Sequence, residues 1–231
     1  MKTTLSDGRL LAAASFVRPG AVLADIGTDH AYLPMHLLQQ GRITRAVAAD
    51  IREGPLSRAR AHIAAAGMEG QIDTVLTNGL QGLDGRGLTD IAICGMGGEL
   101  IVDILSAAPF VRNEGIRLIL QPMTRAATLR RYLAEEGFAT VAERPCRAAG
   151  RVYSCLCAAY DGVRRTLSPA EAEVGCPTCE TEEERACFAE LLERKLCALR
   201  EKIAARAAAS LTTAEDEALL TSLTELQRIY R

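Results

Sequence analysis

Short apolar runs alternate with amphipathic stretches along roughly the first 160 residues of the chain. The run at residues 22–24, for example, is too short for a helix and continuous enough for a strand buried on both faces. Such runs predict seven strands, at residues 22–24, 43–49, 72–77, 89–94, 116–120, 138–143 and 152–159. The amphipathic stretches predict helices at residues 5–17, 30–40, 53–66, 99–108 and 124–136.

The order of these elements predicts the class of fold. Strand and helix alternate until the last two strands, which follow one another through residues 144–151 without a helix. Two successive strands of this kind imply an antiparallel hairpin at one edge of an otherwise parallel sheet. Alternation that ends in such a hairpin is the seven-stranded pattern of Rossmann-like class I methyltransferases. We therefore expect an α/β domain of that class, with Ser6 capping its first helix.

The composition changes after Tyr160, and the change predicts a second domain. A short helical stretch begins at Ser168, and residues 181–209 then contain neither Gly nor Pro. Apolar residues recur there, and again near the end of the chain, at spacings of three and four. Two long amphipathic helices joined by a short turn form an antiparallel, coiled-coil-like hairpin. The predicted domains are a Rossmann-like domain over residues 1–162 and a helical domain over residues 163–231.

Composition narrows the class of protein without identifying it. The 231 residues are 48% hydrophobic and carry a formal net charge of −2, so nothing global points to a nucleic-acid binder. The chain starts with polar residues where a signal peptide would be apolar, and no apolar run is long enough for a membrane span. Eight cysteines in this context do not suggest a disulfide framework, and we expect a reduced, cytoplasmic protein.

The segment that joins the first strand to the next helix has the chemistry of a ligand site. Asp25 ends the strand, Gly27 allows a sharp turn, and a helix is expected to begin near His30. Backbone N–H groups and a helix dipole at one point suit a carboxylate or phosphate. One glycine and two aspartates do not match the three-glycine fingerprint of a pyrophosphate site. The pattern fits a zwitterionic cofactor with a ribose, such as S-adenosylmethionine; the alternative is a plain turn without a ligand.

Polar residues and glycines follow the other strands at the same edge of the predicted sheet. Asp50 ends the second strand, where a carboxylate can accept both hydroxyls of a ribose. Asn78 and Gly79 follow the third strand, and Asn78 could contact the edge of an adenine ring. A solvated strand end and a plain Asn-Gly turn are the alternatives for these positions. After the fourth strand, three glycines in four positions would let the backbone approach a bulky ligand, in the run Gly95-Met96-Gly97-Gly98.

These motifs resemble those of a known family. Five occur in order at suitable spacing: Ala24-Asp25-Ile26-Gly27-Thr28-Asp29-His30-Ala31-Tyr32-Leu33-Pro34, Glu53-Gly54-Pro55, Asn78-Gly79-Leu80, Gly95-Met96-Gly97-Gly98 and Leu118-Ile119-Leu120-Gln121-Pro122. Over roughly residues 5–160 the chain resembles the bacterial TrmK family, the tRNA adenine-22 N1-methyltransferases. The Gly150-Arg151-x-Tyr153 segment is similar too, and the helical hairpin matches in kind. The resemblance implies S-adenosylmethionine as cofactor and tRNA as partner.

The resemblance also implies roles for individual residues. Asp29 is the candidate catalytic residue, which would contact the amino group of the target adenine and offset its developing charge; its alternative is a helix N-cap. His30 could orient cofactor or base, or serve only in packing, and Met96 could form the floor or lid of the base pocket. The implied cofactor-binding residues are Asp25, Gly27, Thr28, His30, Asp50, Asn78, Gly79, Gly95, Met96 and Gly97.

Two departures from the family pattern affect these expectations. The family usually has Asp where this chain has Asn78, so an adenine contact there would come from a neutral amide. Cys176 and Cys179 occupy a region where the family often has no cysteine. Two thiolates are half of the four ligands that zinc usually takes, and no second pair is evident, so we expect no metal site.

Binding to tRNA would require basic side chains near the site. Arginines on the fifth predicted helix and along the hairpin could contact phosphates, or could simply be solvated: Arg125, Arg130, Arg131, Arg144, Arg147 and Arg151. The helical hairpin could clamp the tRNA body or dimerise, and we expect a monomer or a weak dimer. A methyltransferase of the same fold that acts on a small molecule or protein, and a non-catalytic RNA-binding relative, are the alternative functions.

Overall fold

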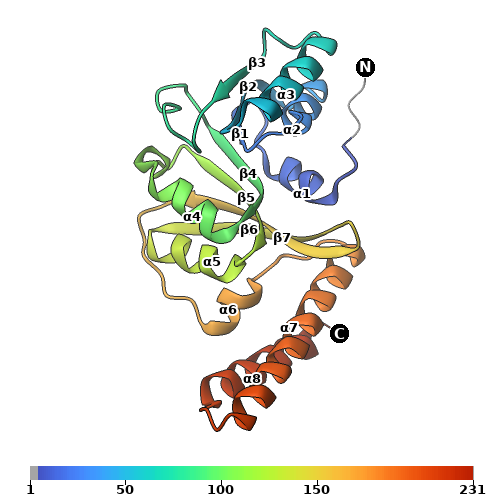
Figure 1. Ribbon diagram of the computed structural model, residues 1–231, viewed down its shortest axis with the longest axis vertical. Helices are drawn as coiled ribbons and strands as arrows, with labels where there is room; N and C mark the ends of the chain where they lie inside the picture. Colours follow the sequence, from blue (N-terminus) through green and yellow to red (C-terminus); the bar gives the residue numbers. More distant parts are fainter. Residues whose placement is uncertain (1–4, 231) are drawn as a thin grey trace.

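The computed structural model describes residues 5–230 and contains one seven-stranded sheet (Figure 1). Residues 1–4 and Arg231 lie outside the described part. The expectation that the chain has no signal peptide concerns residues 1–4 and is therefore not addressed by the structure. The strands are β1 (Ala21–Ile26), β2 (Ile43–Asp50), β3 (Ile72–Leu76), β4 (Asp90–Gly97), β5 (Arg117–Thr124), β6 (Phe138–Ala148) and β7 (Arg151–Tyr160). The helices are α1 (Gly8–Phe16), α2 (Tyr32–Gln39), α3 (Glu53–Ala65), α4 (Gly98–Ser106), α5 (Ala126–Glu135), α6 (Pro169–Val174), α7 (Glu182–Ala208) and α8 (Ala214–Ile229), with a short 3₁₀ turn at Pro109–Val111.

The strand order β3-β2-β1-β4-β5-β7-β6 confirms the predicted class of fold. Strands β1 to β5 pair in parallel, and β7 pairs antiparallel with both β5 and β6. Strands β2 and β3 therefore extend the sheet on one side of β1, and β4 and the later strands extend it on the other. Strands β1 and β4 are parallel neighbours, so their carboxyl ends lie at the same edge. In open α/β sheets, ligands bind in the crevice at this point.

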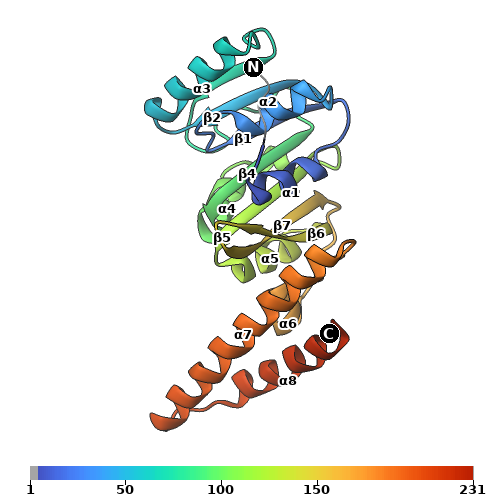
Figure 2. The ribbon, with the colours of Figure 1, turned by 90° about the vertical axis from the view of Figure 1, so that its right-hand side faces the viewer.

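Helices cover both faces of the sheet, as the buried strands require. One core cluster packs α1, α2 and α3 on one face, and a second packs α4 and α5 on the other (Figures 1 and 2). Neighbouring strand residues alternate between them: Leu23 lies in the first cluster and Ala24 in the second, and both are fully buried. This arrangement explains why the strands appear as continuous apolar runs rather than as alternating ones.

The C-terminal helices lie side by side as an antiparallel pair, as the sequence predicts (Figure 2). A third cluster of buried side chains joins α6, α7 and α8, and it includes Phe188 and Leu223. Val152 of β7 also belongs to this cluster, so the helices pack against the end of the hairpin strand. The boundary between two domains near residue 162 stays a prediction.

Several element boundaries differ from the predicted ones. Asp7, rather than Ser6, caps α1 by accepting a hydrogen bond from the Arg9 backbone at 2.9 Å. Strand β4 continues through the glycine run to Gly97, and the expected loop at 144–151 is mostly strand. His30 precedes α2, which begins at Tyr32. Glycines at the end of β4 and Pro145 in β6 are unusual in strands, but these segments pair with the neighbouring strands β5 and β7.

Arg130 is not available to a phosphate, which corrects one of the predicted contacts. Its side chain is 3% exposed and forms an ion pair with Glu143 of β6, whose side chain is 1% exposed. The guanidinium also donates to the carbonyl oxygen of Ala172 at 2.9 Å and to the Ser154 hydroxyl at 3.3 Å. Arg130 therefore fastens α5 to the edge strand and to the end of α6, and its role is structural.

Two further expectations concern membranes and metals. No helix within residues 5–230 is both long enough and apolar enough to cross a bilayer. Within the same residues, no group of three or more His, Cys, Asp or Glu side chains is placed to hold a metal ion. Cys176 is exposed and Cys179 is half-buried, in the segment between α6 and α7.

Candidate active site

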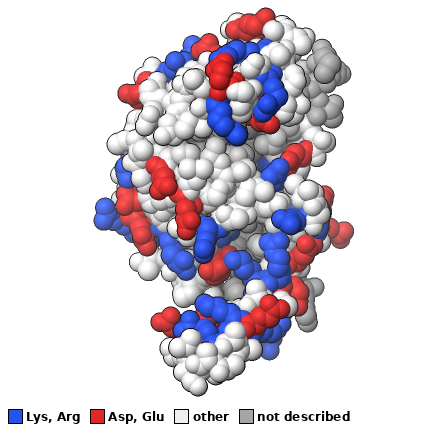
Figure 3. Space-filling view, viewed as in Figure 1, with Lys and Arg blue, Asp and Glu red and all other residues white. Residues whose placement is uncertain are grey.

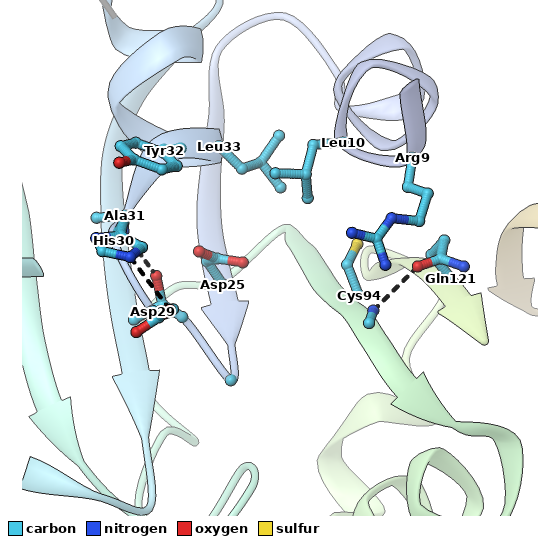
Figure 4. A pocket seen from close by; sticks show the side chains of 13 residues that line it. Arg9, Leu10, Asp25, Asp29, His30, Ala31, Tyr32, Leu33, Cys94 and Gln121 are labelled. Atoms are coloured by element: carbon cyan, nitrogen blue, oxygen red, sulfur yellow. Dashed lines mark hydrogen bonds and ion pairs between the residues drawn. The ribbon is translucent and has the colours of Figure 1, made fainter. Parts of the chain in front are cut away.

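A pocket of about 210 Å³ opens on the sheet where the carboxyl ends of β1, β4 and β5 meet α1 and the start of α2 (Figure 4). Its lining includes six of the predicted site residues: Asp25, Gly27, Thr28, Asp29, His30 and Gly95. The remaining lining residues are Arg9, Leu10, Ala31, Tyr32, Leu33, Cys94 and Gln121. The other predicted residues lie outside this lining: Asp50, Asn78, Gly79, Met96 and Gly97.

The turn after β1 is built differently from the expected anion site. Gly27 takes a positive φ of 77°, and its N–H and that of Thr28 both donate to the carbonyl oxygen of Ala49, at 2.8 and 3.0 Å. The Thr28 hydroxyl accepts from the N–H of Ala31, which is itself left-handed. These N–H groups are therefore used to hold the turn against β2 and are not free to bind a carboxylate.

Asp25 is a buried carboxyl group at the end of β1. It is 7% exposed, and a hydrogen bond from Thr28 is its local partner. Loss of hydration raises the pKa of Asp25 to about 6, and the Thr28 hydrogen bond opposes this shift only in part. A carboxyl group with such a pKa, at a pocket wall, gains most from a positively charged ligand.

This shift predicts how stability and cofactor affinity depend on pH. Between about pH 4 and 6 the folded protein holds a proton on Asp25 that the unfolded chain lacks. The free energy of unfolding without cofactor should therefore fall as pH rises through this window, by up to about 3 kcal/mol. Affinity for a cationic ligand should rise over the same window, because the charged carboxylate is the binding form. Thermal unfolding and calorimetric titration from pH 4 to 8 measure both effects, and parallel changes would contradict the prediction.

Arg9 supplies the positive charge that the turn does not. Its guanidinium donates to Asp7 at 3.0 and 2.6 Å and to the Met123 sulfur at 2.9 Å, and it lies 5.6 Å from the centre of the Tyr153 ring. Figure 4 shows it facing the pocket from α1, while the Asp25 carboxylate faces the pocket from β1. No sequence pattern connects a single arginine on the first helix with this turn, so Arg9 is not among the predicted site residues.

Gly95, at the start of the glycine run that ends β4, lines the pocket, and Met96 packs against the turn beside it. A Cβ atom on Gly27 would lie 2.1 Å from the Met96 methyl, so the glycine is what lets Met96 reach across the turn. Gln121 of β5 fixes the other side by accepting from the Gly95 N–H at 3.1 Å. Burial raises the pKa of the Cys94 thiol, which keeps it neutral and makes it unsuited to nucleophilic chemistry.

Asp29 lies at the exposed rim of the pocket. Its carboxylate accepts from Arg58 of α3, with an Nε–Oδ1 distance of 3.1 Å, and lies 3.2 Å from His30 Nε2. The Arg58 hydrogen bond lowers the pKa of Asp29, so the group is a carboxylate at neutral pH. The alternative of a helix N-cap is wrong, because Ala31 occupies the N-cap position of α2 and no side chain caps it.

The predicted ribose and adenine residues lie further along the same edge. Asp50 is 7% exposed at the end of β2 and accepts from the Arg52 N–H at 2.8 Å. Asn78 and Gly79 follow β3, the next strand of the sheet, and Asn78 is exposed. Their place is consistent with an extended ligand that runs from β4 toward β3. Their roles stay predictions.

The arrangement fits S-adenosylmethionine. Asp25 and Arg9 face one pocket with opposite charges, which matches the ammonium and carboxylate of an amino acid. A side chain at Gly27 would collide with the Met96 methyl, so the turn is limited to glycine at this position. Strand order and pocket together define a Rossmann-like, S-adenosylmethionine-dependent methyltransferase.

Comparison with known proteins identifies the family. Residues 6–156 match a family model described as a methyltransferase domain. The chain is 35% identical over 162 residues to the Bacillus subtilis tRNA (adenine(22)-N(1))-methyltransferase, covering 67% of this chain and 68% of that protein. The chain belongs to the tRNA (adenine(22)-N(1))-methyltransferase family.

Solved structures extend the similarity beyond residues 6–156, which the family model matches. A Streptococcus agalactiae protein of the NADB-Rossmann superfamily is 31% identical, with a TM-score of 0.84 over 98% of this chain and 99% of that one. A Streptococcus pneumoniae protein solved in complex with S-adenosyl-L-methionine is 32% identical, with a TM-score of 0.81 over 95% and 98%. The helical hairpin is thus part of the shared architecture.

Proposed function

We propose that this protein transfers a methyl group from S-adenosylmethionine to N1 of adenine 22 in tRNA. The observation that carries the proposal is the pocket in which a buried Asp25 faces Arg9 at the carboxyl edge of β1 and β4. The curated relative has this activity by name, and a solved relative contains the cofactor. A cytoplasmic location follows from the proposed substrate.

The chemistry requires alignment and charge stabilisation rather than a strong base. S-adenosylmethionine supplies a methyl group on a positively charged sulfur; the N1 lone pair forms the new bond, and the electrons of the broken C–S bond return to sulfur. The positive charge thus ends on the adenine. The protein must hold the two centres in line, exclude water and stabilise that charge.

We assign the amino-acid end of the cofactor to residues of β1 and α1, and its adenosine end to residues that end β2 and follow β3. Asp25 takes the ammonium and Arg9 the carboxylate, while Asp50 accepts the ribose hydroxyls and Asn78 contacts the adenine. Thr28 and His30 support the turn, and the glycines allow close approach: Gly27, Gly79, Gly95 and Gly97. Met96, whose methyl lies over Gly27, is expected to border the cofactor.

Asp29 is the proposed catalytic residue. Its ionised carboxylate at the pocket rim can accept from the adenine amino group while it keeps its bond to Arg58. Asp29→Ala should lower kcat roughly 100-fold with little change in cofactor Kd. Asp103→Ala, which removes an exposed carboxylate on α4, is the matched control. Single-turnover methylation and calorimetry measure the two effects, and an unchanged kcat would exclude Asp29 from the chemistry.

Extrusion of a base from the folded tRNA costs a few kcal/mol, which contacts elsewhere must offset. We assign those contacts to the hairpin α7–α8 and to exposed arginines in and beside α5 and β7, namely Arg125, Arg131 and Arg151. Figure 3 shows acidic side chains interspersed with basic ones on this face. Arg144 and Arg147 already pair with Glu180 and Glu190, so their use would require exchanging partners. A hairpin that dimerises instead is the competing role.

Ribonuclease treatment separates this function from its alternatives. Label transferred from the cofactor to a cell extract should disappear when RNA is digested and should survive protease. Label that survives ribonuclease would indicate a small-molecule or protein acceptor. Binding of tRNA without any transfer would indicate a non-catalytic relative, for which Asn78 is the sequence feature.

A further inference from the structure

Three rings from α2, α3 and the loop between β1 and α2 form a stacked cluster beside the pocket. The centre of the His30 ring lies 4.9 Å from that of Tyr32 and 5.0 Å from that of His62, with ring planes within 11° and 21° of parallel. Tyr32 and His62 are 5.5 Å apart, at 14°. Offset, near-parallel rings at these distances attract one another and hold a fixed orientation.

The cluster reaches the surface through Tyr32, whereas His30 and His62 are half-buried. Tyr32 is 42% exposed at the first position of α2, and both Tyr32 and His30 line the candidate active-site pocket (Figure 4). Polar contacts also orient the two histidine rings: His30 Nε2 lies 3.2 Å from Asp29, and His62 Nδ1 lies 3.3 Å from the His30 carbonyl oxygen. Tyr32 belongs to none of the three core clusters. Packing alone therefore does not account for it.

We propose that Tyr32, supported by His30 and His62, is the platform on which the target adenine stacks. The inference rests on the proposed function and adds to it the surface that receives the base. A flat, immobilised aromatic ring at the pocket rim binds an extruded base through its π-face. Asp29, which touches the cluster through His30, then lies at the edge of the stacked base, where a carboxylate can accept from the amino group.

The platform also suits the charge change of the reaction. When N1 takes the methyl group, one C–S electron pair returns to sulfur and the adenine becomes cationic. A cation over an aromatic face is stabilised by the negative potential of that face. The stacked adenine would therefore be held more tightly as the reaction proceeds, so that removal of the ring lowers kcat and not only tRNA affinity.

Substitutions at Tyr32 test the platform. Tyr32→Leu should lower kcat roughly 10- to 100-fold with a much smaller effect on cofactor Kd, whereas Tyr32→Phe keeps the ring and should lower kcat far less. A second readout uses tRNA transcripts with 2-aminopurine at position 22, bound in the presence of S-adenosylhomocysteine. Stacking on Tyr32 quenches the emission of 2-aminopurine. The complex with Tyr32→Leu should be brighter than those with the unchanged protein and with Tyr32→Phe.

The outcomes distinguish the platform from the proposed function. If the unchanged protein methylates adenine 22 and Tyr32→Leu matches it in kcat and emission, the platform is wrong and the function stands. If Tyr32→Leu and Tyr32→Phe lose kcat equally, the hydroxyl rather than the ring matters, which also overturns the platform. If the unchanged protein methylates no tRNA, the proposed function itself fails. Because Tyr32 is partly exposed, only a small change of Tm is expected for Tyr32→Leu, and circular dichroism checks that both variants are folded.

Discussion

Asp25→Asn is expected to weaken S-adenosylmethionine binding at least roughly 100-fold while it stabilises the protein without cofactor. The carboxylate is buried and its pKa is raised to about 6, so at pH 7.5 the folded protein bears an unfavourable charge that asparagine removes. The same charge is what an ammonium group pairs with, and charge-assisted hydrogen bonds are the strong ones. Calorimetric Kd and thermal unfolding at pH 7.5 measure the two effects.

The prediction is specific because Asp25→Asn should lower the affinity for the cofactor and raise the stability of the protein without cofactor. A variant that merely damages the fold would lose both stability and affinity, and that result would contradict the assignment of Asp25 to the ammonium. Asp73→Asn is the matched control, because Asp73 is an exposed strand residue on β3 away from the pocket. Arg9→Met should weaken binding less than Asp25→Asn does, since Arg9 already has Asp7 as a partner and is less buried.

Arg130→Ala is expected to lower the free energy of unfolding by about 3–5 kcal/mol, because it leaves Glu143 as an uncompensated buried charge. For a chain of this length such a loss lowers Tm by roughly 10 °C. Arg131→Ala, the exposed neighbour on the same helix, should change Tm little. Thermal unfolding followed by circular dichroism measures both variants.

The double variant Arg130→Met with Glu143→Leu gives a further check on this ion pair. Replacing a buried pair by apolar side chains is often neutral, so much of the lost stability should return. A double variant as unstable as Arg130→Ala would mean that the hydrogen bonds to Ala172 and Ser154 carry the effect instead of the charge. Equal Tm values for Arg130→Ala and Arg131→Ala would contradict the structural role of Arg130.

The fold was predictable because the central strands β1, β4 and β5 are largely buried on both faces. The runs before Asp25 and Asp50 place both carboxylates at strand ends, and β1 and β2 are indeed neighbours in parallel. The hairpin was less predictable. Its outer half contains Pro145 and several arginines, which look like a loop, but an edge strand tolerates proline. Arg147 in this half forms an ion pair with Glu190 of α7.

The site was predictable only where it is local in sequence. Asp25, Gly27 and Asp29 fall within one turn, and the order strand, glycine and helix predicts their proximity. Arg9 comes from a separate helix, and its approach to the pocket depends on how α1 packs on the sheet. The backbone N–H groups of the turn were expected to bind an anion, but Ala49 accepts two of them. No local sequence pattern distinguishes Arg130 from a solvated helix arginine, because its partners Glu143 and Ala172 are distant in the sequence.

The central claim is methylation of one atom of one tRNA base, and its most direct test maps the product. Unmodified tRNA transcripts are incubated with the protein and labelled S-adenosylmethionine, and reverse transcription then locates the modified base. A methyl group on N1 blocks the Watson–Crick edge, so we predict an arrest at adenine 22, absent when that position is guanine. Measurable cofactor binding with no label in any tRNA would contradict the account.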